Sequence, residues 1–302
     1  MGHFEFGLNN SWAVKRFAEP EEWVEIAATK MEVKMMQFSL DLLDPMLVSD
    51  TSEYVMRTRD ACRRYGVMLD SCFTGGIAYM SNLLLHPFPA MRRDAFSWYS
   101  KAIELSRQLG TKSLGGHFGA MSVKDFSDQS RRDALISELI ERVESLSKTG
   151  LELGLERLLW EPMPVSREPP STIDEAQTLL KRLGKGVAIP VKLCIDVGHA
   201  CNPNSVNSPS YDTYEWLRRL GADSPCVHLQ QTDGKADRHW PFTREHNSVG
   251  LIEGKKVVSA LDASGAGDVK FFLETFPAFE QKDDDVLLDL RDSVRYWKEF
   301  LD

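Results

Sequence analysis

The sequence of 302 residues has no apolar run of about 18 residues, the length that a membrane-spanning helix needs. Its first residues, MGHFEFGLNNSW, lack the basic and apolar segments of a signal peptide. A basic excess is missing as well, since the formal net charge is −9. This charge argues against a nucleic-acid-binding surface, which is normally basic. A small anionic ligand is not excluded, because it needs only a local cationic pocket.

Cysteine is also scarce, and the sequence contains no CxxC pair. The five cysteines are Cys62, Cys72, Cys194, Cys201 and Cys226. Their number is odd and three of them lie in apolar runs, which does not favour a disulfide framework. We therefore expect reduced, mostly buried thiols in a cytoplasmic protein.

Short apolar segments alternate with longer amphipathic ones along the whole chain. Strands are expected at residues 3–8, 35–40, 67–73, 113–118, 157–162, 191–197, 226–231 and 270–276. Helices are expected at residues 20–30, 51–66, 92–110, 131–150, 172–184, 211–221, 254–265 and 284–301. In the fifth of these helices, Thr172 and Glu175 have the spacing of a capping box.

Eight strand–helix units of about 38 residues predict an α/β fold, a single (β/α)8 TIM barrel over residues 1–302. Length alone would also allow two domains. A doubly wound open sheet is the alternative fold. It usually carries a glycine-rich phosphate loop after its first strand, and FGLNNSW does not provide one.

Polar side chains stand at the ends of the later strands, inside or just after apolar runs. They are His117, Glu161, Asp196, His199, His228 and Glu274. Each alone has an ordinary explanation, such as a strand end that meets water or a core histidine with satisfied hydrogen bonds. In a barrel, however, they converge on the carboxyl-terminal rim. Three carboxylates held together there need a cation to offset their charge. Oxygen-rich ligation with one imidazole suits Mn, Mg or Co, and Zn less specifically.

The segments WEPMPVSRE, CIDVGHA, HLQQTDG and FFLETF resemble the xylose-isomerase-like TIM barrels over essentially the whole chain. This family includes ketose 3-epimerases, hydroxypyruvate isomerases and endonuclease-IV-like proteins. In the epimerase branch, the resemblance implies that Glu161, Asp196, His228 and Glu274 bind one divalent metal. It also implies that Glu161 and Glu274 are the acid/base pair, one on each side of the sugar, acting through an enediolate.

The resemblance further implies that His199 contacts substrate oxygens. The family's second glutamate lies six residues after the first, whereas the nearest residue here, Glu168, lies seven after Glu161. The family's arginine six residues after the strand-seven histidine is replaced by Gly234, so Lys235 or Arg238 would supply that charge.

Two basic clusters in the expected active-face loops favour an anionic substrate. The candidate cations are Lys15, Arg16, Lys235, Arg238, His239, Arg244 and His246, and His117 is a further substrate-binding candidate. The stretches GLNNSWAVKR and HLQQTDGKADRHWPFT are similar to the tetrulose-4-phosphate racemases of erythritol catabolism. The substrate is then a small sugar or sugar phosphate. Four aromatic residues could wall the pocket or simply pack in the core: Trp12, Phe118, Trp160 and Trp240.

Two other functions stay open. The DRH segment at 237–239, with His117 and the Asp196/His199 pair, resembles the zinc motifs of an endonuclease-IV-like phosphodiesterase. That branch also needs a strand-three histidine, which LDSCFTGG lacks. The other alternative is a non-catalytic sugar-binding barrel. One Mn, Mg or Co per chain, three Zn, or no metal would separate these three functions. Related barrels are often dimers or tetramers, so a homo-oligomer is a further alternative to a monomer.

Overall fold

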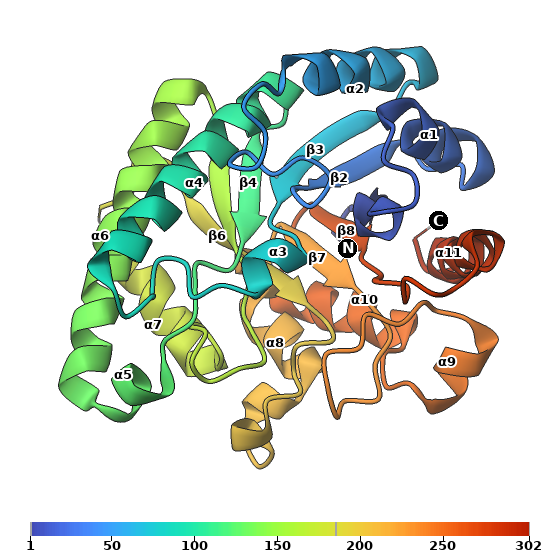
Figure 1. The fold of residues 1–302 in the computed structure, drawn as a ribbon. Helices are drawn as coiled ribbons and strands as arrows, with labels where there is room; N and C mark the ends of the chain where they lie inside the picture. Colours follow the sequence, from blue (N-terminus) through green and yellow to red (C-terminus); the bar gives the residue numbers. More distant parts are fainter. Residues whose placement is uncertain (1, 185, 302) are drawn as a thin grey trace.

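A computed structural model describes residues 2–184 and 186–301 of the chain, and its centre is a closed barrel of parallel strands (Figure 1). The strands are β1 (Phe4–Asn9), β2 (Met35–Ser39), β3 (Met68–Phe73), β4 (Ser113–Gly116), β5 (Arg157–Trp160), β6 (Val191–Asp196), β7 (Cys226–Leu229) and β8 (Val269–Leu273). Each pairs with the next in the sequence, and β8 pairs with β1 to close the barrel. The predicted (β/α)8 TIM barrel is confirmed.

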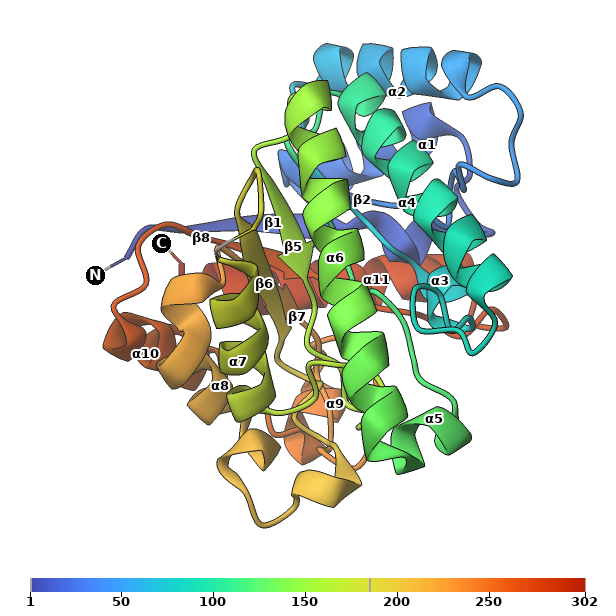
Figure 2. The ribbon, with the colours of Figure 1, turned by 90° about the vertical axis from the view of Figure 1, so that its left-hand side faces the viewer.

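Helices surround the barrel. The eight expected ones are α1 (Pro20–Glu25), α2 (Ser52–Tyr65), α4 (Pro89–Leu109), α6 (Gln129–Leu153), α7 (Ile173–Leu183), α8 (Thr213–Leu220), α10 (Gly254–Ser264) and α11 (Asp283–Lys298). Figure 2 shows α6 along the outside of the barrel, between α4 and α7. Three short helices were not expected: α3 (Gly76–Tyr79), α5 (Val123–Ser127) and α9 (Arg244–Val249). All three lie in loops that follow a strand, where helical periodicity is too short to read.

Several expected helix boundaries differ from the observed ones by up to five residues, and two of them have an identifiable structural reason. The helix expected to end at Gly150 continues to Leu153 and ends at Gly154, which has a φ of 85°. Gly150 lies inside the helix, where a Cβ would be 2.7 Å from Ile189 Cδ1. This glycine therefore allows close packing against Ile189 and does not end the helix. The helix expected over residues 20–30 is α-helical only to Glu25 and continues as a π-helical turn over Ile26–Lys30.

The capping residue of α7 was predicted correctly, but the reciprocal bond differs. The Thr172 hydroxyl accepts the backbone N–H of Glu175 at 3.2 Å. The Glu175 carboxylate reaches one residue further back and accepts the N–H of Ser171 at 2.7 Å. Two donors at the start of the helix are satisfied in this way.

A layer of apolar side chains fills the barrel below its carboxyl-terminal rim. It consists of Met35, Phe73, Leu159, Cys194, Cys226 and Phe272. All five cysteines are free and buried, as expected. Within the described residues, no helix is long and apolar enough to cross a membrane. The polar groups at the rim lie above the packed apolar layer of these six residues.

Candidate active site

Four side chains from the last four strands meet at the rim. Glu161 directly follows β5, Asp196 ends β6, His228 lies in β7 and Glu274 directly follows β8. Parallel pairing sets Asp196 beside His228 in the register of β6 and β7. All four residues are buried, and each offers one ligand atom within 4.8 Å of the others. We call these four residues the acidic cage.

The imidazole of His228 lies at the centre of the acidic cage. Its Nδ1 is 2.9 Å from Glu274 Oε2, 3.1 Å from Glu161 Oε1 and 4.0 Å from Asp196 Oδ2. Asp196 Oδ1 accepts hydrogen bonds from the backbone N–H of Gly198 at 2.6 Å and from Gln230 Nε2 at 3.0 Å. Asp196 Oδ2 is buried and has no hydrogen-bond partner. An unpartnered buried carboxylate oxygen facing other carboxylates marks the place where a cation is needed.

The far side of the His228 ring fixes its preferred tautomer. Nε2 lies 2.7 Å from Gln37 Oε1, an oxygen that also accepts a hydrogen bond from Asn9 Nδ2 at 2.7 Å. The Gln37 amide is oriented in this way because its nitrogen donates to Ser71 Oγ at 3.2 Å. An amide oxygen only accepts, so Nε2 carries the hydrogen. In neutral His228, the Nδ1 lone pair therefore points at three carboxylate oxygens.

The charges around His228 also indicate a cation site. Burial alone would lower the pKa of His228, but the charges of Glu274 and Glu161 outweigh it and raise this pKa well above its ordinary value. Among residues 2–184 and 186–301, no lysine or arginine forms an ion pair with the carboxylates of the acidic cage. Their charge can be balanced by protons on His228 and on the neighbouring His199 and His239, whose pKa values are also raised by nearby carboxylates, or by a divalent cation. Three carboxylates and one imidazole fit Mn, Mg or Co, and also Zn.

Three neutral side chains that the sequence analysis missed hold the acidic cage from the opposite side of the barrel. Gln37 accepts from His228, and Asn9 Nδ2 donates to Glu274 Oε1 at 2.8 Å. The hydroxyl of Tyr79, from α3, donates to Glu161 Oε2. Gln37 is a polar residue in the largely apolar segment MMQFSL, but Asn9 lies in the polar segment GLNNSW and does not stand out there. Nothing in the sequence around Tyr79 pointed to the site.

The predicted substrate-binding residues His199, Glu168 and His239 lie together beside Asp196. His199 Nδ1 is 2.8 Å from the carbonyl oxygen of Pro162, and its Nε2 is 3.2 Å from Asp237 Oδ2. His239 Nε2 lies 3.1 Å from the other oxygen of Asp237. Burial raises the pKa of Glu168 to about 6, although the charge of His199 opposes this. The cluster of Glu168, His199, Asp237 and His239 is called the rim cluster below.

His117 lies deeper than expected of a residue that meets an anion. It directly follows β4, is buried, and its Nδ1 has no hydrogen-bond partner. Burial lowers its pKa to about 4, so the ring is neutral near pH 7. The ring stacks on Tyr79 with centroids 4.4 Å apart and an interplanar angle of 23°.

The predicted cations differ in how far they are already paired. Arg16 pairs with Asp283 at 3.3 Å, and Arg238 Nε pairs with Asp233 at 3.0 Å. Lys15 is exposed, with its Nζ 3.9 Å from the centroid of the Phe279 ring. Lys235 is exposed and forms no ion pair within the described part of the chain.

The last two predicted cations belong to α9. Arg244 begins this helix, and His246 Nδ1 lies 3.0 Å from the hydroxyl of Thr243, the residue that caps it. The His246 ring also packs against Trp240, with centroids 5.1 Å apart. His246 is therefore held by its own helix and its neighbour.

The four aromatic residues divide between packing and the site mouth. Phe118 and Trp160 are buried and pack edge to face at 4.8 Å, and Trp160 Nε1 donates to the carbonyl oxygen of Pro169 at 3.0 Å. Trp240 is half-buried under Arg238. Trp12 lines a cavity of about 580 Å³ at the barrel mouth, between the loops after β1, β3 and β8. The packing explanation therefore holds for Phe118 and Trp160.

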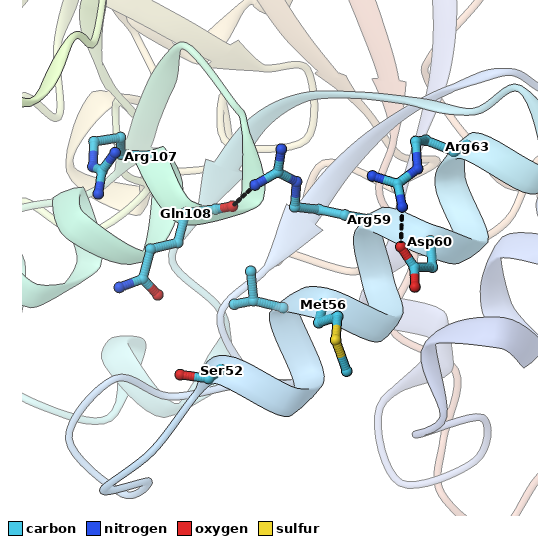
Figure 3. Close-up of a pocket in the computed structure, with 8 residues that line it drawn as sticks. Ser52, Met56, Arg59, Asp60, Arg63, Arg107 and Gln108 are labelled. Carbon is cyan, nitrogen blue, oxygen red and sulfur yellow. Dashed lines mark hydrogen bonds and ion pairs between the residues drawn. The ribbon is translucent and has the colours of Figure 1, made fainter.

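A second cavity, of about 500 Å³, lies between α2 and α4 on the outside of the barrel (Figure 3). Arg59, Arg63 and Arg107 line it, and Arg63 is paired with Asp60. It contains no residue of the acidic cage or of the rim cluster. This cavity is therefore separate from the candidate site.

Comparison with known proteins agrees with this architecture. Residues 25–299 match the sequence profile of the xylose isomerase-like TIM barrels. The chain is 32% identical over 298 residues to a D-erythrulose 1-phosphate 3-epimerase of Brucella abortus, covering 98% of this chain and 96% of that one. The likeness to this epimerase supports the predicted isomerase class.

Solved structures share the same fold. A candidate xylose isomerase from Rhodospirillum rubrum has a TM-score of 0.90 and 29% identity, covering 98% of this chain and 99% of that one. A D-psicose 3-epimerase from Clostridium cellulolyticum H10, solved with D-tagatose, has a TM-score of 0.73 and 15% identity, covering 99% of each chain. At that lower identity the likeness concerns the fold alone. From its profile match and its relatives, the chain is an isomerase-class enzyme that belongs to the xylose isomerase-like TIM barrel family.

Proposed function

We propose that this protein is a metal-dependent 3-epimerase of a tetrulose phosphate. The observation that carries the proposal is the pair of glutamates on either side of His228. Glu161 Oε1 and Glu274 Oε2 lie 3.1 and 2.9 Å from the same nitrogen, and they come from strands on different sides of β6 and β7. Two carboxylates arranged around one centre suit the removal of a proton from one face of a substrate and its return on the other.

The acidic cage would hold the cation through the carboxylates of Glu161, Asp196 and Glu274 and through His228 Nδ1. When bound, a divalent cation supplies Lewis-acid chemistry, which draws negative charge from the ketose oxygens and makes the neighbouring C–H bond more acidic. The cation is proposed as Mn, Mg or Co. The apolar layer beneath the acidic cage excludes water from that side.

The chain's own residues would move the proton. In one direction Glu161 takes the C3 proton, and the electron pair of the C–H bond stays on the substrate as an enediolate. Glu274 then gives a proton to C3 from the opposite face, which inverts the centre. In the reverse direction the two glutamates exchange roles, so one must be ionised when the other is protonated. Asn9 and Tyr79 keep the two carboxylates in place during the exchange.

The phosphate is proposed to lie on C1, beside the ketone. The sequence resemblance suggested C4, whereas the name of the Brucella enzyme carries the phosphate on C1. This end of the substrate would face the rim cluster, with His199 and His239 as hydrogen-bond donors and Lys235, which has no ion-pair partner among the described residues, as a cation. The Asp233 partner of Arg238 reduces the charge that this arginine can offer.

The test is a panel of tetruloses, pentuloses and hexuloses, with and without phosphate, incubated with Mn²⁺ in deuterium oxide. We expect the fastest inversion and deuterium uptake at C3 with erythrulose 1-phosphate. Metal analysis of the purified protein should give about one divalent ion per chain. Three zinc ions together with cleavage of abasic DNA would instead establish the nuclease alternative. Sugar binding with no metal and no exchange would establish a non-catalytic barrel.

A further inference from the structure

One turn of helix, α3, lies across the open end of the barrel (Figure 1). Its amino-terminal end is fixed by Asp41, in the loop after β2. The Asp41 carboxylate accepts the backbone N–H of Gly76 at 2.6 Å and that of Ile77 at 3.0 Å. The approach is so close that a Cβ on Gly75 would lie 2.2 Å from Asp41 Cγ. Asp41 thereby sets where the other end of the turn, Tyr79, lies over the site.

Tyr79 contacts the site in two ways. Its ring stacks on the neutral ring of His117, and its hydroxyl donates to Glu161 Oε2. The other oxygen of the same carboxylate, Oε1, lies 3.1 Å from His228 Nδ1. The phenol and the imidazole therefore define the orientation of the Glu161 carboxylate, with one oxygen assigned to each.

The second glutamate is held differently. Glu274 Oε1 accepts its hydrogen bond from Asn9, a buried residue of strand β1. Tyr79 instead belongs to a single turn whose neighbouring side chains face solvent: Ile77 is 43% exposed and Met80 is 84% exposed. The donor to Glu274 is part of the barrel wall, whereas the donor to Glu161 comes from a loop.

We propose that Tyr79 is a positioning residue for Glu161 in the epimerisation proposed above. Its hydroxyl holds Oε2 and thereby keeps Oε1 directed at His228 Nδ1, where the acidic cage would bind a cation. Of the two proton transfers, only the one at Glu161 depends on this hydroxyl. The transfer at Glu274 depends on Asn9 and is independent of α3.

The test is Tyr79→Phe, which keeps the ring on His117 and removes only the hydroxyl. We expect turnover to fall by about 10- to 100-fold, the usual cost of losing such a supporting partner. Rates alone cannot reveal the asymmetry, because the equilibrium constant fixes their ratio in the two directions. The C3-deuterium isotope effect on kcat/KM can. It should rise for the epimer that Glu161 deprotonates and fall toward one for the other epimer.

Two further variants separate positioning from general damage. Tyr99→Phe removes another buried phenol, one that donates to the carbonyl oxygen of His117 and does not touch Glu161. It should leave both isotope effects unchanged. Asp41→Asn keeps the Tyr79 hydroxyl but weakens the attachment of α3, and it should shift the isotope effects in the same direction as Tyr79→Phe, by less.

A binding measurement tests the inference without turnover. Isothermal titration of each variant with Mn²⁺ alone should show about tenfold weaker binding for Tyr79→Phe and unchanged binding for Tyr99→Phe. Parallel changes of the two isotope effects in Tyr79→Phe, or Mn²⁺ binding equal to wild type, would overturn the proposal. If the wild-type protein does not epimerise tetrulose phosphates, the proposed function fails, and the titration alone then decides whether Tyr79 positions Glu161.

Discussion

Strands β5–β8 and strands β1–β4 meet at one rim but bring different chemistry to it. The first group, here the ligand half, supplies the three carboxylates and the imidazole of the acidic cage. The second group with its loops, the donor half, supplies Asn9, Gln37 and Tyr79, each of which hydrogen-bonds to one member of the acidic cage. None of these three carries a charge.

This division preserves the negative charge of the site. A lysine or arginine in place of Asn9 could also donate to Glu274, but it would neutralise the carboxylate and compete with a bound cation. In place of Gln37 it could not accept the hydrogen of His228. Neutral partners fix the direction of each side chain while leaving the charge for the cation. Asp196 is the exception, because its partners, Gly198 and Gln230, belong to the ligand half.

The largest effect is expected from the ligand half. Glu274→Gln keeps the size of the side chain and an oxygen that can accept from Asn9, but it removes the base. Inversion at C3 should fall by about 10³-fold or more in both directions, and so should deuterium uptake by the epimer that Glu274 deprotonates, while circular dichroism stays unchanged. Glu156→Gln is the matched control, since this exposed glutamate pairs with Lys112 away from the site. Undiminished inversion by Glu274→Gln would remove the acid/base role.

A smaller effect is expected from the donor half. Gln37→Leu removes the acceptor that keeps the hydrogen of His228 on Nε2, and Mn²⁺ affinity should fall by about 10- to 100-fold. Ser71→Ala, which removes only the partner of the Gln37 amide nitrogen, should change it much less. Titration calorimetry measures both. Equal Mn²⁺ binding by Gln37→Leu and wild type would mean that the donor half merely packs against the ligand half.

The sequence predicted the ligand half and missed the donor half for a physical reason. Glu161 and Glu274 directly follow apolar strands, where an unpaired charge is costly, so together with Asp196 and His228 they indicated a site once the barrel was predicted. Asn9 and Gln37 are neutral, and polar residues of this kind are common at strand ends. Tyr79 comes from a four-residue helix, whose place over the barrel depends on its contact with Asp41. That contact joins two loops and leaves no periodic pattern.

The barrel itself was predictable because eight apolar segments recur between amphipathic ones. Helix ends were predictable where glycine caps the helix, as at Gly66 and Gly110, which have φ values of 64° and 84°. The helix end predicted at Gly150 was wrong because glycine also allows close packing, here against Ile189. A glycine's role depends on what lies opposite it, which the local sequence does not contain.

The affinity of the acidic cage for a cation should depend on pH. Because Glu274 and Glu161 raise the pKa of His228 well above its ordinary value, His228 keeps a proton on Nδ1 near pH 7 in the absence of a cation. A cation must displace that proton, so Mn²⁺ affinity should rise by about tenfold per pH unit until the pKa is passed. Calorimetry in two buffers of different ionisation enthalpy should show about one proton released per Mn²⁺. No dependence on the buffer would contradict the central position of His228.

The smallest effect concerns the anion. If the phosphate is held on the ligand half, Lys235→Ala should weaken binding of the phosphorylated tetrulose by about tenfold and should hardly change binding of the free tetrulose. Lys15→Ala, on the donor half, should affect neither, because its ammonium lies over Phe279. Arg238→Ala should change KM by less than about threefold, since the exposed arginine already pairs with Asp233. The KM values of both sugars for the three variants decide this. A larger loss in Lys15→Ala than in Lys235→Ala would move the phosphate to the donor half, and the substrate would then bind in the reverse orientation.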